Sequence, residues 1–283
     1  MRRLALPGIL ERVRAALAFL VTLIAAGTAR AEGDWRARCP GRDRIRGIDV
    51  SKWQGEVDWR AVRAAGIRFA FIRVSDGTTV ADPMFARNWH AARAAGVMRG
   101  AYQYFRPEED PVEQADLLLE AMGALRAGDL PPALDLEVSG QVAPRELVRR
   151  VGRWVERVHR ATGVKPVVYT SARHWAGLAG NSRKFRSHAL WVAHYDVDCP
   201  DTPSGWRQWT FHQVSKQAVV AGITGPVDEN RFRGSWRALR RMTVRSDRAA
   251  ASRWARWRKR ADREAEIARR ESSGASKSRR ASP

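Results

Sequence analysis

The sequence predicts an α/β protein, an irregular (β/α) TIM-like barrel whose last strands lack covering helices. Eight short apolar runs have the length and composition of strands, and several are continuously apolar, as expected when both faces of a strand are buried. Helical patterns separate the early runs, whereas connections rich in proline and glycine separate the late ones. The predicted strands span residues 47–52, 69–74, 99–105, 133–138, 166–170, 190–195, 210–214 and 227–232.

Four helices are predicted between the early strands. Asp58 precedes the first helix, and Pro83, Pro111 and Pro144 open the other three, which is the usual punctuation of a helix start. An open doubly wound sheet is the alternative architecture, but no glycine-rich phosphate loop follows the first strand, which argues against nucleotide binding. The predicted helices span residues 59–65, 84–95, 111–125 and 144–161.

The first 31 residues have the pattern of a secretory signal peptide. Four arginines precede an apolar run at residues 15–27, and Ala29 and Ala31 form a small-x-small cleavage site. The run is short for a membrane span of about 20 residues, although an uncleaved anchor is the alternative. We therefore expect cleavage after Ala31, a secreted or periplasmic protein, an N-terminal lead at residues 32–44 and the barrel at residues 45–235.

Residues 236–283 form a basic tail with 16 lysines and arginines against 5 acidic residues. Much of the formal net charge of +21 therefore lies outside the predicted barrel. We expect the tail to be disordered or partly helical. Its mixture of arginine and tryptophan at residues 253–260 suits an anionic envelope surface. No specific nucleic acid partner is expected, because the predicted cleft is acidic and repels phosphates.

The chain has two cysteines, Cys39 and Cys199, which lie far apart in the sequence. In an exported protein, an even number of cysteines favours a disulfide, here between the mature N-terminus and a late loop. Two free thiols are the alternative, since sequence does not show whether the two residues approach each other.

Candidate catalytic residues cluster at strand ends, where barrel enzymes carry their active sites. Asp135 and Glu137 are two residues apart on the fourth predicted strand, so their side chains share a face. Mutual repulsion and burial raise the pKa of one such carboxyl, and glycosidic cleavage uses carboxyl pairs of this kind. Asp49 and Asp228 lie on the first and eighth strands, which close a barrel. A solvated pair, or an ion pair with a nearby arginine, is the alternative interpretation.

Aromatic and amide side chains near the same strand ends are candidates for substrate binding. Rings with a polar group suit an amphipathic ligand such as a sugar, although each ring taken singly is more often part of a core. The six histidines lack the spacing of zinc ligands, and no Gly-x-Ser-x-Gly motif occurs. No metal or cofactor is therefore expected. The candidates are Tyr102, Tyr104, Tyr169, Trp191, Tyr195 and Gln213.

Seven short motifs at these strands resemble glycoside hydrolase family 25, the Chalaropsis-type lysozymes. They occur in the family's order over about residues 45–235, and together they are far more specific than any one alone. In this sequence they are GIDVSKWQG, FIRVSDG, GAYQYF, LDLE, VYTS, LWVAHY and VDEN. Two departures concern sugar contacts: Gln103 stands where the family often has histidine, and Phe211-His212-Gln213 replaces a strand resembling Trp-Gln-Tyr.

The resemblance implies an irregular barrel and hydrolysis of the β-1,4 bond between N-acetylmuramic acid and N-acetylglucosamine in peptidoglycan. Glu137 would be the general acid and base, Asp135 would assist through the substrate's 2-acetamido group, and Asp49 and Asp228 would frame the site. A monomer is expected. A non-catalytic barrel that binds peptidoglycan or another carbohydrate is the alternative, but it predicts a damaged carboxylate set. A chitin-cleaving barrel predicts a D-x-x-D-x-D-x-E run, which is absent.

Overall fold

The computed structural model describes Cys39 and residues 44–280, which contain a closed barrel of eight strands. The predicted signal peptide and most of the predicted lead lie outside the described residues. Hydrogen bonding runs in the order β1-β9-β8-β7-β6-β5-β4-β2, and a β1–β2 pairing closes the circle, which confirms the predicted architecture. The strands are β1 Ile45–Val50, β2 Phe69–Asp76, β4 Met98–Tyr104, β5 Ala133–Asp135, β6 Val167–Thr170, β7 Leu190–Ala193, β8 Phe211–Ala218 and β9 Val227–Phe232.

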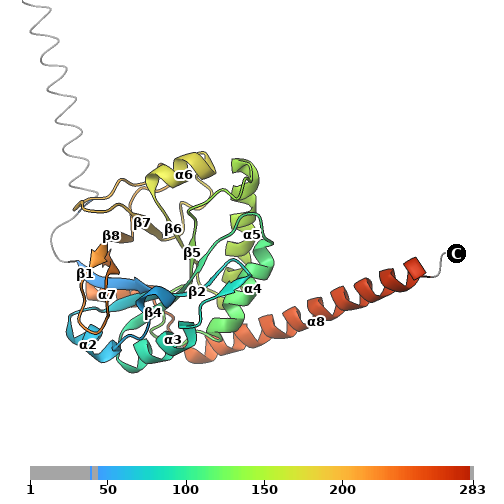
Figure 1. Cartoon of the computed structure of the whole chain (residues 1–283), viewed down its shortest axis with the longest axis horizontal. Coiled ribbons are helices and arrows are strands. Elements are labelled where there is room, and N and C mark those ends of the chain that lie inside the picture. The colour runs from blue at the N-terminus through green and yellow to red at the C-terminus, as the bar shows by residue number, and fades with distance from the viewer. Residues whose placement is uncertain (1–38, 40–43, 281–283) are drawn as a thin grey trace, which may run out of the picture. The chain divides into compact units, whose positions relative to one another are not determined.

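Helices cover only part of the barrel (Figure 1). The short helix η1 follows β1, and α6 follows β6, but the described chain between β7 and β9 contains no helix. The predicted scarcity of helices around the last strands is therefore confirmed, whereas α6 and the two-residue strand β3, Val80–Ala81, are additional elements. The helices are η1 Lys52–Gln54, α2 Trp59–Ala64, α3 Phe85–Ala94, α4 Pro111–Met122, α5 Pro144–Thr162 and α6 Ala172–Ala179.

Local chemistry accounts for the ends of these helices. The Asp58 carboxylate accepts hydrogen bonds from two backbone N–H groups in the first turn of α2, and the Asp110 carboxylate does the same for α4. Pro111 and Pro144 occupy the first positions of α4 and α5, where a missing N–H costs no hydrogen bond. Gly163 ends α5 in the left-handed conformation that glycine adopts without strain.

Strand β9 runs antiparallel to both of its neighbours, β1 and β8, whereas the other neighbouring strands of the barrel run parallel. Its first residues therefore lie at the end of the barrel where the other strands finish. The register places Asp228, near the start of β9, directly beside Asp49, near the end of β1. This reversal is what brings the eighth strand's carboxylate to the predicted site.

Aromatic rings fill the interior of the barrel. Phe71 stacks on Trp191 with ring centroids 4.4 Å apart, and Phe69 and Phe211 pack beside them. Two glycines make room for this packing: a Cβ at Gly47 would lie 2.4 Å from the Phe69 ring, and one at Gly100 would lie 2.7 Å from the Phe71 ring. The rings support the floor of the cleft described below.

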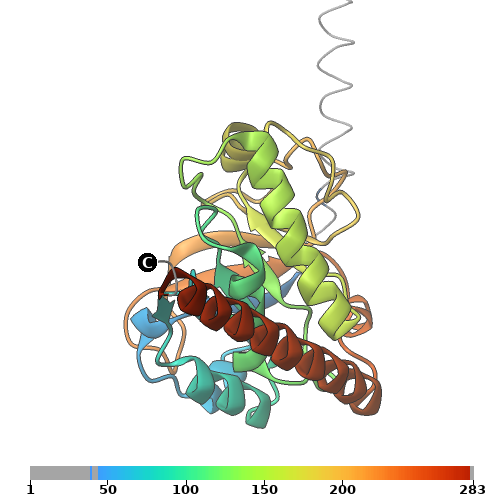
Figure 2. The ribbon, with the colours of Figure 1, turned by 90° about the vertical axis from the view of Figure 1, so that its right-hand side faces the viewer.

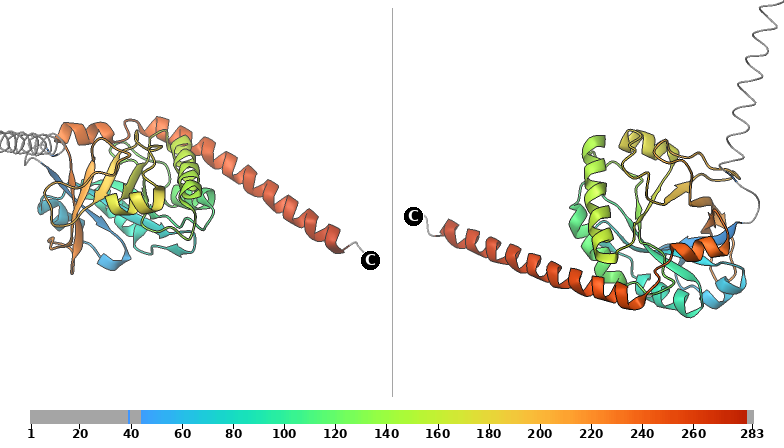
Figure 3. Two further views of the ribbon diagram at one scale, coloured as in Figure 1. Left: turned by 90° about the horizontal axis from the view of Figure 1, so that it is seen from above. Right: turned by 180° about the vertical axis from the view of Figure 1, so that it is seen from behind.

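Two helices follow the barrel, α7 at Trp236–Met242 and α8 at Asp247–Arg280. Leu239 of α7 is buried in the barrel core, and Trp257 of α8 is buried with its indole N–H 3.3 Å from Asp116 Oδ1 of α4. Figure 2 shows the start of α8 beside the carboxyl end of α5, and Figure 3 shows the rest of α8 extending away from the barrel.

Neither α8 nor any other described helix has the length and hydrophobicity needed to cross a bilayer. Both cysteines of the chain, Cys39 and Cys199, are disulfide-bonded.

The close approach at Gly47 predicts a destabilising effect of added volume. Gly47→Ala should lower the free energy of unfolding by about 1–3 kcal/mol, because the new methyl group collides with Phe69 in a filled core. Gly177→Ala is the matched control: a Cβ there meets no atom within 4 Å in α6, and alanine should stabilise the helix by about 0.5–1 kcal/mol. Denaturant titration measures both. Equal effects of the two substitutions would contradict the packing argument.

Candidate active site

One cleft, of about 260 Å³, brings together all of the predicted catalytic and substrate-binding residues. It opens where β1, β5 and β6 finish and β9 begins. Its lining includes the carboxylates Asp49, Asp135, Glu137 and Asp228. The same lining includes the six candidates for substrate binding, Tyr102, Tyr104, Tyr169, Trp191, Tyr195 and Gln213.

The first carboxyl pair is held by the end of β5. The strand ends at Asp135, three residues earlier than predicted, yet the backbone stays extended: the Leu136 N–H donates to the Tyr169 carbonyl at 3.0 Å. Leu136 is fully buried on the side away from the cleft. Asp135 and Glu137 therefore face the same side, as their spacing predicts, and their carboxyl groups are hydrogen-bonded to each other.

Burial is the main reason that the pKa of Asp135 is raised well above its usual value. The charges of Glu137 and then Asp49 raise the pKa further, whereas Arg73 lowers it. Asp135 is 6% exposed, and its Oδ1 has no hydrogen-bond partner in the described part of the chain. Asp135 therefore keeps its proton to a higher pH than a carboxyl group in water.

The second pair, Asp49 and Asp228, is arranged in the same way across the β1–β9 junction. Asp49 Oδ2 accepts hydrogen bonds from Gln213 Nε2 at 2.8 Å and from Asn230 Nδ2 at 2.7 Å. Burial, followed by the charge of Asp228, raises the pKa of Asp49 well above its usual value. Burial also raises the pKa of Asp228, but its hydrogen bond with Asp49 lowers it. The two carboxyl groups therefore hold a proton to a higher pH than they would in water.

Gln213 connects this pair to the aromatic side of the cleft. Its Oε1 accepts the hydroxyl protons of Tyr169 at 2.7 Å and of Tyr195 at 3.0 Å, while its amide donates to Asp49. Because amide orientation is set by these partners, the glutamine fixes both tyrosine hydroxyls and one carboxylate at once.

The aromatic residues of the cleft divide into a floor and a rim. Trp191 is 1% exposed, packs against Tyr102 and Tyr169, and donates its indole N–H to Asn230 at 2.7 Å. It forms the floor. Tyr195 is 37% exposed and Trp53, on η1, is 76% exposed, so these two rings are at the rim and accessible to a ligand.

The cleft also contains two basic side chains that the sequence analysis did not predict, Arg73 and Lys216. Arg73 forms an ion pair with Asp82 at 3.0 Å. The sequence does contain a signal for Arg73, because it is a charged residue within an otherwise apolar predicted strand. Lys216 has its ammonium 5.7 Å from the Tyr195 ring centre, beyond a break in the β8–β9 register. Nothing in the local sequence predicts that break, and bulges of this kind often redirect side chains beside active sites.

Of the residues that depart from the family pattern, Gln213 lines the cleft, whereas Gln103 and His212 do not. Gln103 is buried behind the barrel wall, where its amide donates to Ser75 and accepts from the Trp154 indole at 2.7 Å. His212 is also buried; its Nε2 contacts the His194 carbonyl at 2.7 Å, and burial lowers its pKa to about 4. Gln103 thus contributes to packing behind the cleft and is not part of its lining.

Among the described residues, no cluster of three or more histidine, cysteine or acidic side chains has the arrangement of a metal site.

Comparison with known proteins matches residues 48–223 to the model of glycosyl hydrolases family 25. The chain belongs to glycoside hydrolase family 25. It is 42% identical over 204 residues to YegX of Escherichia coli K12, itself described as uncharacterized, covering 70% of this chain and 73% of YegX. It is 35% identical over 201 residues to Lysozyme M1 of Streptomyces globisporus, covering 68% of each chain.

The solved structure of a bacterial lysozyme from Streptomyces coelicolor superposes with a TM-score of 0.69 at 33% identity. The superposition covers 98% of that chain but only 72% of this one. The family match ends at residue 223, so helices α7 and α8 lie beyond it.

The Asp49–Asp228 pair predicts an unusual dependence of stability on pH. The raised pKa of Asp49 means that the folded protein holds this proton to a higher pH than the unfolded chain, so the free energy of unfolding falls as pH rises through that interval. Asp49→Asn keeps a neutral hydrogen-bonding group at every pH. The variant should therefore be more stable than the wild type at neutral pH, and this gain should shrink in acid.

Thermal unfolding between pH 4 and pH 8 measures this effect. Asp196→Asn is the control, because Asp196 is exposed and in the left-handed conformation that asparagine also tolerates. An unchanged pH profile for Asp49→Asn would show that the proton on Asp49 does not contribute to stability.

Proposed function

We propose that this protein is a lysozyme-type muramidase, which hydrolyses the β-1,4 bond between N-acetylmuramic acid and N-acetylglucosamine in peptidoglycan. The observation that carries the proposal is the pair of hydrogen-bonded carboxyl groups, Asp135 and Glu137, at the mouth of a family 25 barrel. Membership of that family and similarity to Lysozyme M1 support the choice of substrate.

In this proposal, the Asp135–Glu137 pair enters the reaction with one proton. Glu137 is the less buried member and lines the cleft, so it is the group placed to pass the proton to the leaving glycosidic oxygen. Loss of the proton leaves two carboxylates beside the anomeric carbon, where positive charge develops in the transition state. Burial strengthens this stabilisation, because the surroundings screen charge less than water does.

Asp135 also acts in this first half. It orients the substrate's 2-acetamido group, whose oxygen lies near the anomeric carbon of such sugars, and so assists the departure of the leaving group. In the second half, water attacks the anomeric carbon and Glu137, now a carboxylate, accepts a proton from that water, which restores the one-proton pair. Asp49 and Asp228 hold a second proton nearby, and this reduces the negative charge that opposes deprotonation of the first pair.

The rim residues supply the proposed sugar contacts. Tyr104, Tyr195 and Trp53 present rings to the open side of the cleft, and aromatic faces bind the apolar faces of sugar rings. The floor of the cleft either contacts the sugar directly or positions the side chains that do. Its residues are Tyr102, Tyr169, Trp191 and Gln213.

We further propose that the enzyme works as a secreted or periplasmic monomer after cleavage near Ala31, since a disulfide is expected to persist only in an oxidising compartment.

Substitution of the proposed acid tests the central role. Glu137→Gln should reduce the rate of peptidoglycan hydrolysis by about 10²–10⁴-fold or more, because glutamine cannot donate the proton. Release of new reducing ends from purified peptidoglycan measures the rate, and identifying the end as muramic acid identifies the bond. Glu113→Gln, on the exposed surface of α4, is the control and should retain full activity. Wild-type lysis by Glu137→Gln would contradict the assignment.

The non-catalytic alternative makes a different prediction from the same assay. A barrel that only binds peptidoglycan would release no reducing ends even as the wild type, while still sedimenting with cell walls.

The shared proton predicts the shape of the pH profile. In Asp135→Asn, the charge coupling that raises the upper apparent pKa of the pair is absent, so activity should be lost at a lower pH on the alkaline side. The residual rate should also fall, since the amide assists the acetamido group less well. The profile of kcat/KM against pH measures both changes. An alkaline limb that stays in place would show that Asp135 does not share the catalytic proton.

A further inference from the structure

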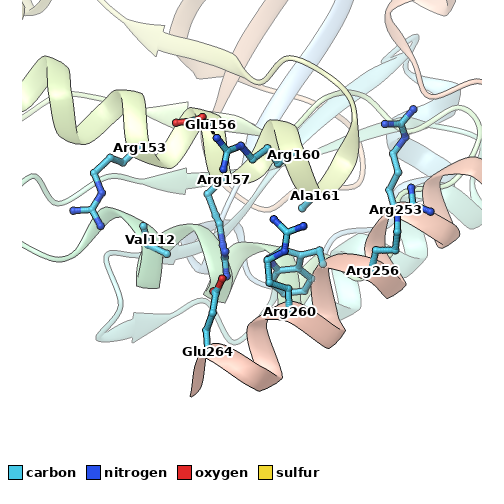
Figure 4. A pocket seen from close by; sticks show the side chains of 11 residues that line it. Val112, Arg153, Glu156, Arg157, Arg160, Ala161, Arg253, Arg256, Arg260 and Glu264 are labelled. Atoms are coloured by element: carbon cyan, nitrogen blue, oxygen red, sulfur yellow. Dashed lines mark hydrogen bonds and ion pairs between the residues drawn. The ribbon is translucent and has the colours of Figure 1, made fainter. Parts of the chain in front are cut away.

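A second cavity lies between α5 and α8, on the outside of the barrel, with a volume of about 510 Å³. None of its lining residues lines the catalytic cleft. Figure 4 shows arginines entering it from both helices. We call this cavity the arginine groove; its six arginines are Arg153, Arg157 and Arg160 of α5 and Arg253, Arg256 and Arg260 of α8.

The arginines of α5 already have carboxylate partners. Arg157 forms ion pairs with Asp116 at 2.7 Å and with Glu264 of α8 at 2.9 Å. Arg160 pairs with Glu156, and Arg153 lies 3.8 Å from Asp110. Of these contacts, the Arg157–Glu264 ion pair joins α5 to α8, and together they offset the charge on one wall of the groove.

The three arginines that α8 contributes to the groove have no such partners among the described residues. Arg253, Arg256 and Arg260 form no ion pair with any carboxylate in the described part of the chain, and Arg256 donates only to the Ser252 hydroxyl at 2.7 Å. The six arginines meet four carboxylates in these ion pairs, so two positive charges remain in excess at one concave site. Clustered like charges repel one another, so the arrangement is stabilised by an anion that enters the groove.

Packing keeps these three side chains facing α5. Residues 253, 256 and 260 follow helical spacing along one face of α8, and Trp257 between them is buried against α4. Arg253 approaches Gly163 so closely that a Cβ there would lie 2.7 Å from the guanidinium, at the carboxyl end of α5, where cations are favoured. The groove is therefore a packed feature of the fold.

We propose that the arginine groove binds phosphate groups of a phosphodiester-linked polyol or sugar polymer of the cell envelope. The planar guanidinium group donates two parallel hydrogen bonds to a phosphate, and a polymer with one charge per unit matches several arginines in a row. A polymer bound there would hold the barrel at the wall. That targeting role rests on the proposed muramidase function, whereas phosphate binding itself does not.

Two other polyanions fit the groove less well. Trp257 is only 6% exposed, so the lining lacks an accessible ring on which a nucleic acid base could stack. Beyond the groove, α8 mixes acidic and basic residues and exposes a single large apolar side chain among its described residues, Ile267, which is a poor face for insertion into lipid.

Binding of a defined-length poly(glycerol phosphate) oligomer to the full chain tests the proposal. Arg256→Ala with Arg260→Ala should weaken binding at least about tenfold, because the double variant loses two guanidinium groups that donate charge-assisted hydrogen bonds to phosphate. Arg248→Ala with Arg263→Ala is the matched control: it removes the same charge from α8, outside the groove, and should leave the affinity nearly unchanged. Thermal unfolding shows whether both variants are folded.

Several outcomes would overturn the proposal. Equal losses in the two double variants would show unspecific attraction to a basic helix. Tighter binding of polyglutamate, of a single-stranded oligonucleotide or of phosphatidylglycerol vesicles than of poly(glycerol phosphate) would show that another anion is the ligand. Absence of measurable binding by the wild type at physiological salt would exclude the site.

A separate pair of measurements distinguishes this site from the catalytic one. Glu137→Gln should bind poly(glycerol phosphate) like the wild type while releasing no reducing ends. The wild type should lyse walls that carry their phosphate polymer faster than stripped walls, and the groove variant should lyse both at the same rate. Binding without lysis would reject the muramidase proposal and leave the arginine groove intact.

Discussion

The hydrogen bonds that Asp49 accepts from Gln213 and Asn230 join β1, β8 and β9 at the mouth of the barrel. At this junction the last strand, β9, runs antiparallel between β1 and β8. Gln213 extends the junction to Tyr169 and Tyr195, and Asn230 extends it to Trp191. The floor, one wall and one carboxyl pair of the cleft therefore depend on a single hydrogen-bonded network.

Burial gives the same network its chemistry. Carboxyl groups taken out of water retain protons to a higher pH, and the two pairs in the cleft each do so beside a second carboxylate. Such pairs oppose the stability of the fold at neutral pH, and the packed aromatic core beneath them offsets that cost. The barrel interior is accordingly filled by Phe69, Phe71 and Phe211, with glycines at Gly47 and Gly100 admitting the rings.

The helices that follow the barrel, α7 and α8, lie beyond the match to the family 25 model, which ends at residue 223. Leu239 continues the core, and Trp257 fixes the start of α8 against α4. Once that stretch is anchored, the arginines on one face of α8 meet those of α5, and a basic tail becomes a concave site. Composition alone predicts that the basic residues of the tail are spread along a solvated extension. In the folded protein, three of its arginines instead lie together at one place on the surface.

The sequence by itself determined the family, the barrel and the identity of the four carboxylates, because motif order and the two-residue repeat of a strand are local properties. The Asp135–Glu137 spacing is sufficient to place both groups on one face. Only the tertiary structure decided that β9 is antiparallel, that Trp191 is a floor rather than a rim, and that Arg73 and Lys216 join the cleft.

It also decided that Gln103 supports packing, and that α8 folds back against α5. These features arise from pairing between segments far apart in the chain. The direction of a strand, the burial of a side chain and the raised pKa of Asp49 all depend on which distant residues become neighbours. A local sequence pattern does not contain that information.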